Sequence, residues 1–99
     1  MKIEKIQEND TLTVSLEGRL DTLTAPELGN EIQGKLDGVK NLVFDFAKLA
    51  YISSAGLRIL LSAQKVMNKQ GSMVIKNAGP EVKEIFDVTG YSRFLNIEN

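Results

Sequence analysis

The chain has 99 residues, a length that suits one domain spanning residues 1–99 and allows one modest core. Hydrophobic residues make up 42% and charged residues 25%, as in ordinary globular proteins, and a net charge of −1 gives no support for binding to nucleic acid or to a membrane surface. The sequence lacks cysteine, histidine, an apolar signal segment and a membrane-spanning run, which argues against disulfides, thiolate metal sites and the commonest general base, and predicts a cytoplasmic protein.

The first half of the sequence predicts a hairpin, a helix and a buried strand. Residues 2–6 are expected to form a short strand, residues 7–10 a polar turn, and residues 11–17 a half-buried strand in which apolar and polar side chains alternate. A helix is expected over residues 25–37, because apolar residues recur there at helical spacing. Residues 41–46 are a mostly apolar run, which is typical of a central strand.

Local signals at both ends support this first helix. Thr24 is followed three residues later by Glu27, which is the spacing of a capping box, and Pro26 lies in the first turn, where its missing N–H has no cost. Gly38 lies where a left-handed residue often ends a helix. The helix is therefore expected to fill the interval between Thr24 and Gly38.

The second half of the sequence predicts two more helices and two more strands. They are a helix over 54–70 that stops at Gly71, a strand over 72–76, a helix that begins at Pro80 and ends at Gly90, and a short strand over 94–97. The predicted order is β-β-α-β-α-β-α-β. Because strands that alternate with helices imply parallel crossovers, we expect an α/β fold with a mixed central sheet of about five strands and helices mainly on one face.

The segment most informative about function is the start of the helix at 54–70. If Ser53 is the N-cap residue, its hydroxyl can accept a hydrogen bond from an early helical N–H group. Ser54 is then the first helical residue, with an exposed hydroxyl beside free N–H donors and the positive end of the helix dipole. A phosphate there would be favoured by about 0.3–1 kcal/mol. On spacing alone, two serines before a helix are usually only a cap.

One face of this helix is polar and mildly basic. Its residues are Ser54, Arg58, Ser62, Lys65 and Lys69. Spacings of three and four residues place them on one side of a helix. A hydroxyl that can be phosphorylated therefore lies at the start of a docking stripe, although a stripe of this kind taken alone is usually just a solvated face.

Three blocks of the sequence, in the right order, resemble the STAS family, the sulphate transporter and anti-sigma antagonist domain. Residues 51–57 (YISSAGL) resemble the family signature Asp-Ser-Ser/Thr/Ala-Gly-Leu, in which the first serine after the Asp is phosphorylated. Residues 18–28 (GRLDTLTAPEL) resemble the motif before the first helix, and residues 80–90 (PEVKEIFDVTG) resemble the last helix. The resemblance places the phosphoacceptor at Ser54. The family's Asp is Ser53 here, which makes Ser53 an alternative acceptor.

The resemblance implies a free-standing anti-sigma factor antagonist that is not an enzyme and has no cofactor, catalytic residue or metal site. Such a protein binds an anti-sigma factor, usually a serine kinase, and so releases the sigma factor. The kinase phosphorylates the antagonist, which then dissociates, and a PP2C-type phosphatase resets it. The resemblance together with the polar face of the helix gives the residues expected at the partner interface, which are Asp21, Thr22, Ser53, Ser54, Gly56, Arg58 and Ser62.

Two other functions stay open at this point. One is an unphosphorylated STAS domain that serves as a structural or regulatory subunit of a transporter or a stress-signalling complex. The other is an enzyme, because Ser62 and Lys65 match the Ser-x-x-Lys spacing of a serine nucleophile and its lysine base, although no second motif accompanies them.

Ligand-binding alternatives have weaker support in the sequence. The Gly-Lys pair at 34–35 and the Gly-Pro pair at 79–80 lack the glycine spacing of a nucleotide-binding loop, so they are expected to be ordinary helix ends. Asp21 and Asp45 are candidates for a metal pair, but an Asp at the end of a strand more often caps a turn.

Overall fold

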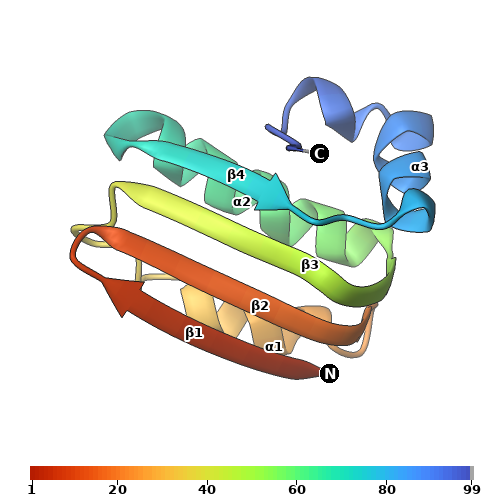
Figure 1. The fold of residues 1–99 in the computed structure, drawn as a ribbon, viewed down its shortest axis with the longest axis horizontal. Helices are drawn as coiled ribbons and strands as arrows, with labels where there is room; N and C mark the ends of the chain where they lie inside the picture. The colour runs from red at the N-terminus through yellow and green to blue at the C-terminus, as the bar shows by residue number, and fades with distance from the viewer. Residues whose placement is uncertain (99) are drawn as a thin grey trace.

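The computed structural model describes residues 1–98, which form a four-stranded sheet with helices packed against it (Figure 1). In chain order the elements are β1 (Lys2–Glu8), β2 (Thr11–Leu20), α1 (Ala25–Ile32), β3 (Asn41–Ile52), α2 (Ser54–Gln70), β4 (Ser72–Lys76), α3 (Pro80–Thr89) and the short 3₁₀ helix η1 (Tyr91–Arg93). The predicted α/β class with a mixed sheet is confirmed.

The sheet has the strand order β1-β2-β3-β4. β1 and β2 pair antiparallel, whereas β2 with β3 and β3 with β4 pair parallel. Each parallel pair is joined by a helical crossover, and α1 and α2 lie behind the same face of the sheet in Figure 1. The carboxyl ends of β2 and β3 therefore meet at one edge, where the chain leads into α1 and α2.

The opening hairpin is tighter than the sequence predicts. Pairing continues from Lys2 to the Glu8–Thr11 pair, which leaves a two-residue loop in place of the polar turn expected at residues 7–10. Asn9 has a positive φ of 57°, a left-handed conformation that asparagine tolerates better than most residues. A turn of this kind lets the strands pair to their ends.

The core lies between the sheet and the three helices. Val14, Phe44 and Ile75 are fully buried on neighbouring strands. Phe86 of α3 stacks against Phe46 of β3, with ring centroids 6.5 Å apart. This contact holds α3 on the same side of the sheet as the other two helices.

α2 is the longest helix, as predicted, with 17 residues. Leu57, Leu60 and Met67 on its inner side are almost completely buried. Among residues 1–98, no helix is both long enough and apolar enough to cross a membrane.

The prediction that the first helix reaches residue 37 is wrong. α1 ends at Ile32, because Gln33 is extended (ψ 126°) and Gly34 has a φ of 72° that is incompatible with a helix. Leu36 is nevertheless only 6% exposed. Leu36 has helical spacing from Ile32, but its burial comes from a loop that folds back on the core and not from a helix.

Two strand predictions also need correction. β3 extends to Ile52, six residues beyond the predicted end at 46, and its second half pairs with β2 through a register that shifts twice. The shifts break the strict alternation of inward and outward side chains, so the apolar pattern that predicts a strand is weaker after residue 46. The predicted final strand over 94–97 is reduced to a single bridge between Ile97 and Ile75, which makes a four-stranded sheet.

Candidate functional site

The candidate site lies where β2 and β3 end and α2 begins. The amide of Ser53 donates to the carbonyl of Leu20 at 2.8 Å, and the amide of Leu57 donates to the carbonyl of Ser53 at 2.9 Å. The end of β2, the end of β3 and the first turn of α2 are thus joined by consecutive backbone bonds. The loop after β2 and the start of α2 are held at one edge of the molecule.

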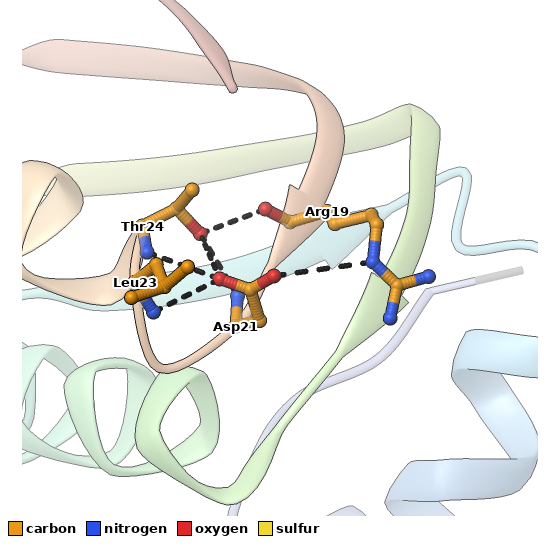
Figure 2. A network of polar contacts seen from close by, with 4 residues as sticks. All are labelled: Arg19, Asp21, Leu23 and Thr24. Atoms are coloured by element: carbon orange, nitrogen blue, oxygen red, sulfur yellow. Dashed lines mark hydrogen bonds and ion pairs between the residues drawn. The ribbon is translucent and has the colours of Figure 1, made fainter.

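Asp21 organises the loop between β2 and α1 (Figure 2). Its Oδ1 atom accepts hydrogen bonds from the amides of Leu23 at 3.0 Å and Thr24 at 3.1 Å. The Thr24 hydroxyl accepts from the Asp21 amide at 2.8 Å and donates to the Arg19 carbonyl at 2.7 Å. The predicted capping box is therefore wrong: Thr24 makes no side-chain cap bond to α1, because its hydroxyl is used inside the loop.

These contacts also set the charge of Asp21. The backbone amide of Thr24 makes the largest contribution that holds the pKa of Asp21 below its ordinary value, with smaller ones from Leu23, the Thr24 hydroxyl and Arg19. The Arg19 Nε lies 3.9 Å from Asp21 Oδ2, and its guanidinium lies 4.3 Å from the centre of the Tyr51 ring. Asp21 is thus an ionised, structural carboxylate that fixes the loop.

The two serines at the start of α2 have different environments. Ser53 occupies the N-cap position, but its side chain makes no cap bond, so the predicted capping interaction is not formed. The Ser53 Oγ is buried and has no hydrogen-bond partner within residues 1–98. Ser54 is exposed at the first helical position. Of the two serines, Ser54 is therefore the one whose side chain is open to solvent.

The polar face of α2 is open to solvent and positively charged. Its members, Ser54, Arg58, Ser62, Lys65 and Lys69, are all exposed. α2 contains no Asp or Glu. None of its three cations takes part in an ion pair within the described residues. We call these five residues the α2 stripe.

The other predicted interface residues divide into two kinds. Thr22 is exposed in the loop after β2. Gly56 is buried, and a Cβ atom there would lie 2.7 Å from Leu20 Cγ and 2.9 Å from Ile52 Cγ1, so its role is packing. Leu23 was missed by the sequence analysis: it is 86% exposed in the same loop. Its position directly after Asp21 and Thr22, two residues that were predicted to lie at the interface, could have indicated it.

The structure gives little support to the ligand-binding alternatives. Asp45 accepts hydrogen bonds from the nearby Ala47 amide at 3.0 Å and from the side chain of the distant Asn77, whose Nδ2 lies 3.1 Å away, so its carboxylate is occupied by the protein itself. Ser62 and Lys65 are both exposed on the α2 stripe. Within residues 1–98, no group of three or more Asp and Glu side chains is arranged to hold a metal ion.

The family model of the STAS domain matches residues 2–99. The chain belongs to the STAS family. This STAS chain is 33% identical over its whole length to BtrV of Bordetella bronchiseptica, which bears the name of an anti-sigma factor antagonist, and covers 87% of it. It is 28% identical to the anti-sigma-B factor antagonist of Bacillus subtilis, with 94% of this chain and 85% of the relative covered. Its fold matches the structure of the anti-sigma factor antagonist SpoIIAA in its unphosphorylated form, with a TM-score of 0.84, 18% identity, and 99% and 89% of the two chains covered.

Proposed function

We propose that this STAS protein is an anti-sigma factor antagonist whose binding is switched by phosphorylation of Ser54. The observation that carries the proposal is the exposed Ser54 at the start of α2, one turn before Arg58, on a helix face that continues to Lys65 and Lys69 and on a helix that contains no carboxylate. The identity to proteins named anti-sigma factor antagonists along nearly the whole chain supports the same role.

The chemistry of the switch follows from the position of Ser54. A kinase transfers the γ-phosphoryl group of a nucleotide to the Ser54 Oγ, which adds about 1.5 to 2 negative charges at neutral pH. The helix dipole favours that charge by about 0.3–1 kcal/mol, so the fold tolerates it. Arg58 lies one turn further on the same face, where it can pair with the phosphate. The modified protein therefore stays folded but presents a different surface to its partner.

The partner in this proposal is an anti-sigma factor with serine-kinase activity. Unmodified antagonist binds it and so releases the sigma factor for transcription in the cytoplasm. A phosphate that is buried without adequate partners at the interface costs a few kcal/mol, and about 2.8 kcal/mol already corresponds to a hundredfold loss of affinity. A phosphatase of the PP2C type removes the phosphate. The antagonist itself is a substrate and a ligand in this cycle.

Phosphosite mapping tests the proposal. The purified protein, Ser53→Ala and Ser54→Ala are each incubated with the anti-sigma kinase of the same organism and ATP, and the modified residue is identified by mass spectrometry. We expect one phosphate on Ser54 in the unmodified protein and in Ser53→Ala, and none in Ser54→Ala. Modification confined to Ser53 would overturn the assignment. A complete absence of phosphate on all three proteins would favour the alternative function, in which the STAS domain is an unphosphorylated subunit of a larger complex.

A further inference from the structure

The early end of α1 leaves a groove between α1 and α2. The chain turns away after Ile32, and the groove that opens has a volume of about 330 Å³. One side is formed by the end of α1 and the loop after it, and the opposite side by α2; the lining residues are Ile32, Gln33, Gly34, Leu36 and Asp37 on the first side and Ile59, Ser62, Ala63 and Val66 on the second. We call this feature the α1–α2 groove.

The groove contains apolar surface that the rest of the chain does not cover. Val66 is 42% exposed on its α2 wall, and Ile59 is half-buried. Ile32 and Ala63 also line the groove but are only 2% and 3% exposed, so most of the exposed apolar surface belongs to Val66 and Ile59. A side chain that entered the groove would remove this apolar surface from water, which favours association.

Three exposed lysines lie close in the chain to residues that line the groove, although they are not part of its lining. Lys65 and Lys69 lie on α2 next to Val66, and neither takes part in an ion pair within residues 1–98. Lys35 follows Gly34 in the loop that forms the other side. Asp37 is the acidic residue that lines the groove. An occupant with an apolar side chain inside the groove and carboxylates outside it, against Lys65 and Lys69, complements this arrangement, because unlike charges then meet.

The groove is continuous with the proposed switch surface. Ser62 belongs both to the α2 stripe and to the groove wall. Eight residues separate it from Ser54, which is about 12 Å along a helix that rises 1.5 Å per residue. A partner interface of ordinary size, about 800 Å² on each protein, reaches across that distance.

From these observations we infer that the α1–α2 groove receives an acidic amphipathic segment of the same anti-sigma factor that docks at Ser54. The inference rests on the proposed function and extends it. The segment inserts an apolar side chain between Ile32 and Val66 and places its carboxylates against Lys65 and Lys69. The groove anchors the complex at a point distant from the phosphate, while Ser54 switches it.

Calorimetry with the purified anti-sigma factor and ADP tests this inference. Val66→Asp places a carboxylate in the groove and is expected to weaken binding at least tenfold, and Val66→Ala two- to fivefold. Val88→Asp on α3, where Val88 is 79% exposed, is the matched control and is expected to change binding less than twofold. Lys65→Glu is expected to weaken binding. The difference in affinity between this variant and the parent protein should shrink as the salt concentration rises, because salt screens the attraction between Lys65 and the carboxylates of the partner.

The variants separate this inference from the proposed function. Because Val66 and Val88 are both exposed, thermal unfolding should show that both variants fold like the parent protein. If Val66→Asp and Val66→Ala bind like the parent while Ser54→Asp binds weakly, the groove is not part of the interface although the switch stands. Equal losses in Val66→Asp and Val88→Asp would also overturn the groove. If the parent protein does not bind the anti-sigma factor at all, the proposed function fails together with the groove.

Discussion

Gly56 and Leu20 approach so closely that a Cβ atom on Gly56 would lie 2.7 Å from Leu20 Cγ. Leu20 is the last residue of β2, and Gly56 lies in the first turn of α2. The contact therefore presses the start of α2 against the end of the sheet. In this way it sets the position of Ser54 along the direction from the sheet edge, next to the loop that contains Asp21.

Gly56→Ala is expected to destabilise the protein by about 1–3 kcal/mol, because overpacking displaces Leu20 and Ile52. The gain of about 1 kcal/mol that alanine brings to a helix interior is smaller in this first turn and offsets only part of that loss. Chemical denaturation measures the difference. Gly79→Ala is the control for the added methyl group, since nothing lies within 4 Å of a Cβ there; Gly79 is the N-cap residue of α3, so this control is expected to lose less than about 1 kcal/mol through the weaker cap. Equal stability of Gly56→Ala and the parent protein would show that the contact relaxes freely.

Ser53→Ala is expected to change the free energy of unfolding by less than about 0.5 kcal/mol, or to stabilise the protein slightly. The reason is that the Ser53 hydroxyl is buried without a hydrogen bond, so its removal leaves no partner unsatisfied. A hydroxyl that capped α2 would instead be worth about 0.5–2 kcal/mol. A loss of that size in urea denaturation would contradict the geometry found at the N-cap.

The loop that contains Leu23 is expected to loosen in acid. Because hydrogen bonds, chiefly from the Thr24 amide, lower the pKa of Asp21, its contribution to stability is present above its ordinary pKa of about 4 and is lost as the pH falls through the lower folded value. The protection factors of the Leu23 and Thr24 amides, which compare the exchange rate measured by NMR with the intrinsic rate at the same pH, should fall over that acid range. The protection factors of Asp21→Asn should not change there. If the parent protein shows no change either, the carboxylate does not hold the loop.

Leu23→Ala is expected to weaken binding to the anti-sigma factor about tenfold and to leave stability unchanged. Leu23 is 86% exposed, and Asp21 holds its backbone, so its side chain is displayed at little entropic cost on binding. Calorimetry and thermal unfolding give the two values. Val88→Ala, another exposed aliphatic residue, is the control. Similar affinities of Leu23→Ala and Val88→Ala would remove Leu23 from the interface.

The sequence predicted the arrangement of elements well, because that depends on apolar spacing and on glycine and proline at the ends. α2 runs from Ser54 to Gln70 as expected, and Gly90 ends α3 with a left-handed φ of 81°. The end of α1 was mispredicted because Ile32 and Leu36 have helical spacing, whereas the backbone at Gly34 decides the conformation.

Side-chain hydrogen bonds were harder to predict. Thr24 and Ser53 both occupy N-cap positions, as expected, yet neither makes the cap bond. The Thr24 hydroxyl has nearer partners at Arg19 and Asp21, which come together only after β2 and its loop have formed. The α1–α2 groove was not predicted at all, because it depends on the same unexpected end of α1.

The most direct test of the central claim is the affinity of Ser54→Asp and Ser54→Ala for the anti-sigma factor, measured by calorimetry with ADP present. Ser54→Ala should bind like the unmodified protein and stay bound when ATP is supplied. Ser54→Asp should bind at least tenfold more weakly, since it places a negative charge where the phosphate goes, although it has less charge and fewer acceptor oxygens. If Ser54→Asp binds as tightly as the unmodified protein, and stoichiometric phosphorylation leaves the affinity unchanged, Ser54 is not the switch.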